Sequence, residues 1–264
     1  MERKFIGAGL FAGLVAGIVS FVFARIFIEP QVAKAIAFEE SQSKAEEMAH
    51  AAEHAAEQDH HGEVEVFSRT IQENFGAGVG TVVFALAMGA FFAVAFTVLW
   101  AYVGRRWPST DPRAVVGALG LLGFVAAFGV PFFVYPANPP AVGDDATIGE
   151  RSGSFLIITL VSVIAMIIAV VVALQLRDRI GGLAGATIAG IGYLVVIGVA
   201  KELLPEFHEV PAGFPAAVIG DFRVYAIANQ VVLWTVLTLV FAAAISAFTR
   251  RTEQAAGDLV TAAR

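Results

Sequence analysis

The sequence predicts an all-α polytopic membrane protein with about six transmembrane helices. Hydrophobic residues make up 58% of its 264 residues and charged residues only 15%, whereas a soluble domain carries about 25% charged residues. Six apolar stretches are long enough to cross a bilayer as helices, which takes about 20 residues. These stretches are continuously apolar rather than alternating as in a β-barrel, and lipid offers no water to open backbone groups. We therefore expect each stretch to be helical.

The spans are expected in chain order, and the first of them is not a signal peptide. Arg3 and Lys4 precede its apolar run, but the run is longer than the 7–15 residues of a signal sequence and no small-residue cleavage site closes it. Arg25 and the Glu29-Pro30 pair follow instead. The expected spans are Phe5–Ile28, Gly76–Val103, Ala114–Tyr135, Gly153–Leu176, Gly181–Leu204 and Tyr225–Phe248.

Basic residues alternate between the connections. The two ends of the chain and the connections 104–113 and 177–180 contain ten basic and five acidic residues, while the remaining segments contain seven basic and eighteen acidic ones. Because Lys and Arg concentrate in cytoplasmic segments, we expect both termini in the cytoplasm and a location in the inner (plasma) membrane. The segments 29–73, 136–152 and 205–223 would then face outward.

The chain divides into three parts by composition. Residues 1–28 form the first span, residues 29–75 an outward acidic segment that contains histidines, and residues 76–264 a membrane bundle with a short cytoplasmic tail. The outward loops that begin at Pro136 and Pro211 are similar, since both are rich in proline and alanine and end in Gly-Asp. The bundle is therefore expected to contain a repeated hairpin, residues 114–176 and 181–248, as in parallel-repeat transporters. Coincidence between two turns is the alternative.

The acidic segment holds four of the five histidines of the chain. It is rich in Ala, Glu and Lys between Ala33 and Gln58, which favours a helix, and Gly62 would end that helix. Several of its metal-ligating residues fall within an arc of roughly 80° on such a helix. Imidazole and carboxylate groups suit divalent transition metals, although a solvated helix with incidental histidines fits the same pattern. The residues predicted to contact metal here are His50, His54, His60, His61, Glu46 and Glu57.

A second group of polar residues lies at the predicted outer ends of spans five and six. Its predicted metal-contacting members are His208, Glu206 and Glu209, with Glu202 beside them. An interfacial Lys201–Glu202 pair is the simpler interpretation of those two residues. For Asn229 and Gln230, in the first turns of span six, the simpler interpretation is a hydrogen bond between helices.

Glycines and prolines mark close packing and irregular backbone. Gly9, Gly13 and Gly17 form two overlapping GxxxG steps, which let another helix approach closely. That helix could belong to the chain itself, to a second copy or to a partner subunit. Pro131 inside span three and Pro205 at the end of span five are expected to break or kink their helices.

Other functional classes are excluded or lack support. The net charge of −6 argues against a broad nucleic-acid-binding face, and the absence of cysteine excludes thiolate metal sites and disulfides. No GxxxxGK[ST], HExxH or GxSxG motif occurs. Nothing pairs a nucleophile with a base, so no enzyme activity and no tightly bound cofactor are expected.

Four features together resemble the CbtA family of probable cobalt transporter subunits. They are the N-terminal span that ends near Glu29-Pro30, the His/acid segment, the Pro-rich loop Tyr135–Gly149, and the stretch from Glu209 to Pro215 before the last span. The resemblance implies a cobalt-related role in the inner membrane, beside a small one-span partner subunit of the CbtB type.

Two functions remain open from the sequence. The first is transport of cobalt, or of nickel, with the metal captured by the outward His/Glu segment and passed to the helix bundle. The second is a non-transporting scaffold or sensor subunit of a metal-uptake system, which could form a homo-oligomer. Histidine and carboxylate accept Co, Ni and Zn in similar geometries, so the residues leave the metal open.

Overall fold

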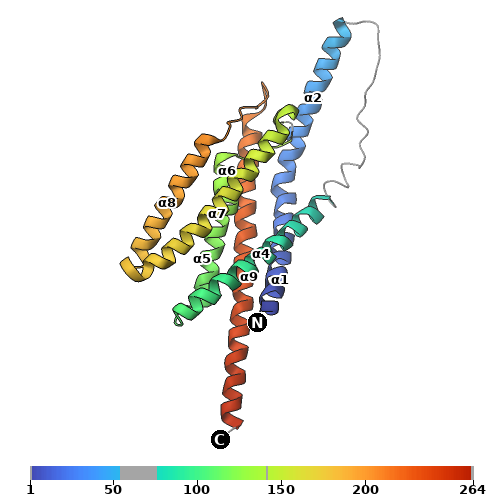
Figure 1. Ribbon diagram of the computed structural model, residues 1–264. Coiled ribbons are helices and arrows are strands. Elements are labelled where there is room, and N and C mark those ends of the chain that lie inside the picture. Colours follow the sequence, from blue (N-terminus) through green and yellow to red (C-terminus); the bar gives the residue numbers. More distant parts are fainter. Residues whose placement is uncertain (1, 54–75, 141, 263–264) are drawn as a thin grey trace. The chain divides into compact units, whose positions relative to one another are not determined.

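The computed structural model describes residues 2–53, 76–140 and 142–262, and these residues form helices joined by short connections, with no strand among them (Figure 1). Six helices are long and apolar enough to cross a membrane. The predicted all-α membrane fold is therefore confirmed, while the direction in which the termini face stays a prediction. The helices are α1 (Glu2–Phe23), α2 (Glu29–Glu53), α4 (Ala77–Arg106), α5 (Pro112–Phe124), α6 (Val130–Val134), α7 (Ile148–Ile180), α8 (Gly182–Leu203) and α9 (Ala216–Ala262).

Two prolines lie inside continuous helices rather than at their ends. A π-helical turn, Ala24–Ile28, joins α1 to α2, and another, Val125–Gly129, joins α5 to α6. Pro30 and Pro131 each follow their π-helical turn by two residues. Proline lacks an N–H and its ring clashes with the carbonyl four residues earlier. The wider π turn accommodates both defects.

Three expectations about these helices are decided by the structure. Glu29-Pro30 ends the apolar stretch but not the helix, because one helix runs through Arg3–Met48. Pro131 does not end span three, since helix continues to Val134, but the π-helical turn Val125–Gly129 interrupts the regular α-helix just before it. The expected break near Pro205 is confirmed, because α8 ends at Leu203.

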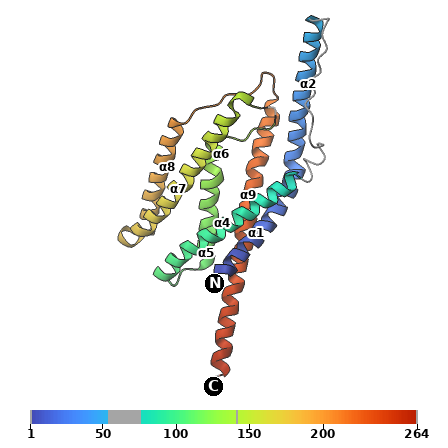
Figure 2. The same cartoon turned by 45° about the vertical axis from the view of Figure 1, so that its right-hand side comes forward.

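The chain forms two compact units, the first of which contains residues 1–23, 73–124 and 228–264. In it α1 lies against α4 (Figure 2). The side chains of Phe92, Phe96 and Phe241 form its aromatic core, with ring centroids 5.2–5.3 Å apart between Phe241 and the other two. Ser20, which is fully buried, donates a hydrogen bond of 2.9 Å to Asn229 Oδ1. The interpretation of Asn229 as a link between helices is confirmed.

The glycine face of α1 packs inside this unit. A Cβ on Gly9 or Gly13 would collide with the backbone carbonyl of Gly89 or Ala85 on α4, and one on Gly17 would lie 2.9 Å from the Ala85 Cβ. The sequence left three partners open for this face: the chain itself, a second copy and a partner subunit. In the structure the face packs against α4 of the same chain.

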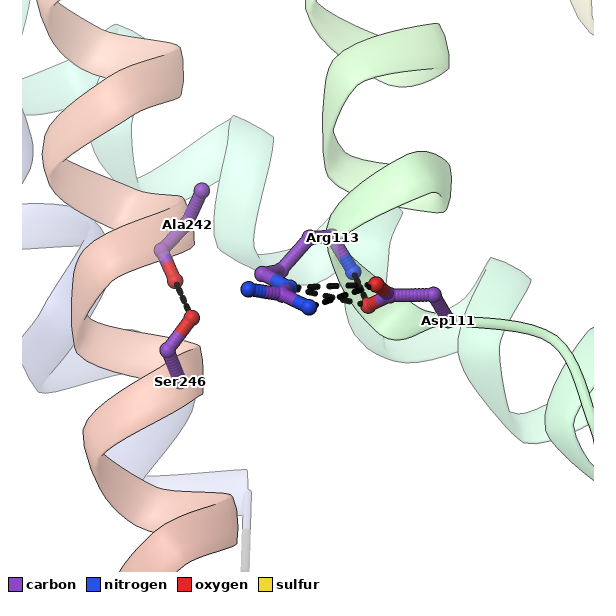
Figure 3. A network of polar contacts seen from close by, with 4 residues as sticks. All are labelled: Asp111, Arg113, Ala242 and Ser246. Atoms are coloured by element: carbon purple, nitrogen blue, oxygen red, sulfur yellow. Dashed lines mark hydrogen bonds and ion pairs between the residues drawn. The ribbon is translucent and has the colours of Figure 1, made fainter.

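Asp111 and Arg113 begin helix α5 after the short connection from α4. The Asp111 carboxylate accepts hydrogen bonds from the Arg113 backbone N–H at 2.8 Å and from its guanidinium at 2.9 Å (Figure 3). Asp111 therefore acts as an N-cap, with Pro112 at the first helical position. These hydrogen bonds from Arg113 lower the pKa of Asp111 below its ordinary value. Both side chains are about half exposed, 47% and 63%, so the pair adds little to stability.

The second unit contains residues 24–72 and 125–227, with α2, α6, α7, α8 and the start of α9. Helices α7 and α8 form an antiparallel hairpin (Figure 1) whose turn is at Gly181, with a φ of +91°. A buried hydrogen bond of 2.8 Å joins the hydroxyls of Ser162 and Tyr193 across the hairpin. This extensive pairing joins spans four and five, which belong to different copies of the predicted repeat. The repeat itself stays a prediction.

Candidate functional site

The second unit contains a cavity of about 1020 Å³ between α2 and two loops, residues 135–147 and 204–215. We call it the acidic cavity because five carboxylate residues line it, against one arginine. Its ionisable lining residues are Glu39, Glu46, Asp144, Asp145, Glu209, Arg151 and His208.

One face of α2 forms a wall of this cavity. Glu39, Gln42, Ser43 and Glu46 line it, and their spacing of three and four residues places them on one side of a helix. An apolar cluster fixes this face, in which the fully buried Ala35 packs with Val142, Phe214, Val218 and Ile219. The rings of Phe38 and Phe214 meet edge to face with centroids 4.9 Å apart. Apolar packing one turn earlier therefore turns the acidic face of α2 toward the loops.

Glu209 is the most constrained carboxylate of the cavity. It accepts hydrogen bonds from the Asp144 backbone N–H at 2.9 Å and from the Thr147 hydroxyl at 2.7 Å, and its Oε2 lies 3.3 Å from Arg151 Nε. The Asp144 N–H and Thr147 hydroxyl, followed by the positive charge of Arg151, lower the pKa of Glu209. Glu209 is therefore a carboxylate near neutral pH, and it joins the two loops through Asp144 and Thr147.

Arg151 lies where two cavities of the unit meet, because it lines both of them. Its guanidinium also donates to the Asp144 carbonyl at 3.1 Å. The guanidinium lies against Gly143, which has a φ of +135° and where a Cβ would overlap it. The backbone conformation therefore favours glycine at this position, and a Cβ there would in addition require the flexible Arg151 guanidinium to shift.

Glu206 and His208 form a second polar group after the end of α8, and His208 lines both cavities. The Nε2 atom of His208 lies 3.5 Å from Glu206 Oε2, and Lys201 Nζ lies 3.6 Å from carboxylate oxygens of Glu202 and Glu206. The side chains of His208 and Glu206 are 86% and 67% exposed. The Lys201–Glu202 pair that the sequence suggested is present, and it extends to Glu206.

The structure gathers some of the predicted metal-contacting residues and not others. Glu46, His208 and Glu209 line the acidic cavity, whereas Glu206 lines the neighbouring cavity. His50 lies on α2, and His54, Glu57, His60 and His61 fall outside the described residues. Among the residues that the structure describes, no three of His, Asp or Glu are grouped so that they could hold a metal ion. Metal contact by the nine residues stays a prediction.

The sequence did not single out four residues of the acidic cavity as site residues: Glu39, Asp144, Asp145 and Arg151. Glu39 could have been predicted, because it precedes Glu46 by two helical turns and so lies on the same face of the helix. Asp144 and Asp145 lie within the Pro-rich loop Tyr135–Gly149, but only the fold brings them beside α2.

Comparison with known proteins places the chain in a family. The model of the family described as "Probable cobalt transporter subunit (CbtA)" matches residues 2–246. The chain belongs to the CbtA family. No curated protein and no solved structure matched it. Membership makes it a subunit of a cobalt transport system and not an enzyme, and its six apolar helices make it a multi-pass membrane protein.

Proposed function

We propose that this subunit moves cobalt ions across the bacterial inner membrane, and that the outward acidic segment captures the metal before the helix bundle receives it. The observation that supports the proposal is the acidic cavity, which is lined by Glu46 of the predicted capture segment and by His208 and Glu209 of a loop between two spans. Glu46 precedes His50 by four residues on α2, and the remaining histidines of the predicted capture segment follow outside the described residues.

The charge of the cavity suits a divalent cation. Five carboxylates against one guanidinium leave a strongly negative lining, which raises the local concentration of cations at the mouth of a pathway. Carboxylate and imidazole are ligands of borderline metals such as Co²⁺ and Ni²⁺. Since no tight group of three ligands is present among the described side chains, the cavity would bind metal weakly and release it readily, as transport requires.

Uptake in this direction needs no nucleotide site of its own. An inside-negative potential favours entry by about 2.3 kcal/mol per elementary charge per 100 mV, and a divalent ion gains about twice that amount. The metal would travel from the acidic cavity past Glu206 and His208 toward the bundle.

Cobalt accumulation in cells tests the proposal. Cells that lack the gene should accumulate less cobalt at low external concentrations, and the wild-type gene should restore uptake. A variant with His50, His54, His60 and His61 changed to alanine, and a Glu39→Gln/Glu46→Gln variant, should restore it only in part. Glu150→Gln removes an exposed carboxylate from the first turn of α7 outside the cavity and should restore uptake fully. Equal accumulation with and without the gene would reject the permease.

The proposed orientation can be tested independently, because the sequence contains no native cysteine. Ser43 on α2 and Ser109 between α4 and α5 are both exposed. In whole cells an impermeant thiol reagent should label Ser43→Cys and should label Ser109→Cys only after the membrane is opened. The reverse pattern would place the acidic cavity on the cytoplasmic side.

A scaffold or sensor role is the second candidate, and the description of the family as a subunit favours it. In that case a CbtB-like one-span partner or a second copy would complete the pathway. Purified chain in liposomes separates the two functions, since a permease gives cobalt flux alone and a scaffold gives none until its partner is added.

A further inference from the structure

The second unit has another cavity, of about 830 Å³, whose walls are mainly apolar and include six aromatic side chains. We call it the aromatic cavity. Phe128, Phe132 and Phe133 come from the π turn and α6, Phe155 comes from α7, and Tyr135 and Phe207 come from the loops. Its ionisable lining is predominantly basic, with Arg223, Lys201 and Arg151 against the one carboxylate of Glu206, and with His208 beside them. A cavity of this size can hold a molecule as large as a typical small ligand.

The aromatic cavity lies at one end of the spans of its unit. Helix α6 ends at Val134, α7 begins at Ile148 and α8 ends at Leu203, and residues next to all three ends line the cavity. The Tyr135 hydroxyl donates to the Pro205 carbonyl at 2.7 Å. Tyrosine and cationic side chains at helix ends are typical of the headgroup level of a bilayer. These are the features expected at the level where a lipid headgroup meets its acyl chains.

Arg223 gives this cavity a positive charge that has no carboxylate partner among the residues that the structure describes. Its Nε donates to the Ala137 carbonyl at 3.2 Å and its Nη2 donates to Asn138 Oδ1 at 2.7 Å. Both acceptors are uncharged, and no carboxylate of the described chain forms an ion pair with Arg223. Arg151 and Lys201, by contrast, have glutamate partners. A part-buried guanidinium without a counter-ion favours an anion, and its planar fork matches the oxygens of a phosphate group.

The apolar wall distinguishes a lipid from a free anion. Phe133 is 81% exposed and Phe155 is 44% exposed, so the wall continues from the cavity onto the outer surface of a membrane-spanning unit. A free phosphate would leave these rings uncovered, whereas acyl chains would cover them.

We propose that the aromatic cavity binds one anionic phospholipid. Its phosphodiester pairs with Arg223, with Lys201 nearby, and its acyl chains lie along Phe132, Phe133 and Phe155. The lipid would join the loop 135–147 to the start of α9 through Arg223. The proposal is independent of which ion the chain moves, and it does not require that the chain moves any.

Lipid that remains on the purified full-length chain tests this proposal. The chain is extracted from bacterial membranes in a mild detergent, and its bound lipids are identified by mass spectrometry. We expect about one phosphatidylglycerol or similar anionic lipid per chain, and at least a fivefold loss in Arg223→Gln. Arg179→Gln removes an exposed arginine at the opposite end of α7 and should leave the retained lipid unchanged.

Two further experiments distinguish specific binding of an anionic lipid from binding of a free anion and from nonspecific lipid binding. Delipidated chain should take up phosphatidylglycerol from mixed vesicles in preference to phosphatidylcholine, and millimolar inorganic phosphate should not displace it. Displacement by phosphate, or equal uptake of both lipids, would overturn the proposal.

Arg223 also holds the loop, so a second pair of variants guards against misfolding. Arg223→Lys keeps the charge without the fork, and Phe155→Ala shortens the apolar wall without touching the loop. Each should retain less anionic lipid than wild type while remaining monodisperse. Wild-type amounts of anionic lipid in Arg223→Gln, or in both of these variants, would show that the cavity is not a lipid site.

Discussion

The backbone N–H of Asp144 donates a 2.9 Å hydrogen bond to the carboxylate of Glu209, and this contact joins two loops that lie 65 residues apart in the sequence. Thr147 and Arg151 hold the same carboxylate from the start of α7. Glu209 is therefore a structural centre of the acidic cavity as well as one of its negative charges. The two roles respond differently to pH and to substitution.

Because of Glu209, the folded chain should become less stable at acid pH. Its pKa is lowered in the folded protein from an ordinary value of 4.5, so its contribution to stability is complete above 4.5 and is lost as the pH falls through the folded pKa. We expect the thermal midpoint of wild-type chain in detergent to fall as the pH drops below 4.5. Glu209→Gln should have a lower midpoint than wild type near neutral pH, and its midpoint should change less as the pH falls. Glu150→Gln, as control, should follow the wild-type curve. Identical curves for Glu209→Gln and wild type would contradict the structural role.

Gly143 should be the least replaceable glycine of the loops 135–147 and 204–215. Gly143→Ala strains a backbone at φ +135° and also displaces the Arg151 guanidinium, whereas Gly213→Ala strains a backbone at φ +80° with open space around the new Cβ. Strain of this kind costs about 1–3 kcal/mol at either position. Thermal unfolding should therefore show a larger loss for Gly143→Ala than for Gly213→Ala. Equal losses would mean that Arg151 moves aside freely.

The close contact between α1 and α4 should depend on Gly13 and not on Gly7. A Cβ at Gly13 meets the backbone of Ala85, while one at Gly7 meets nothing within 4 Å. Gly7→Ala should be neutral or stabilise the helix by about 0.5–1 kcal/mol, and Gly13→Ala should destabilise the chain by forcing the helices apart. The check is thermal unfolding of both variants in the same detergent. The packing would be refuted by a Gly13→Ala variant as stable as Gly7→Ala.

The sequence predicted the spans well because apolar length is a local property. The expected limits Gly181–Leu204 and the observed α8, Gly182–Leu203, nearly coincide. The continuation of the helix through Pro30 could not be predicted in this way. The π turn that accommodates the proline cannot be recognised from the local amino-acid composition. The glycine face of α1 was recognised from spacing alone, but its partner α4 could be chosen only by the fold.

The candidate site was predictable in residue type and not in arrangement. Glu46, His208 and Glu209 were selected for their chemistry, and they line one cavity. Their neighbours Asp144 and Arg151 come from a loop and a helix that only tertiary packing brings beside Glu209. The sequence grouped Glu209 with Glu206 and His208. In the structure its carboxylate instead contacts the Asp144 backbone N–H, the Thr147 hydroxyl and the Arg151 guanidinium.

The part-buried hydrogen bond between Ser20 and Asn229 offers a last test, on the link between α1 and α9. Ser20 Oγ donates to Asn229 Oδ1 at 2.9 Å across two helices, and such bonds contribute about 0.6–2 kcal/mol in membrane proteins. Ser20→Ala and Asn229→Leu should each destabilise the chain, and the double variant should lose less than the sum of the two. Ser246→Ala serves as control because its hydroxyl bonds to Ala242 within α9 at 2.8 Å (Figure 3) and joins no second helix. The measurement is thermal or denaturant unfolding. If the destabilisation of the double variant equals the sum of the two single ones, the Ser20–Asn229 contact contributes no interaction energy.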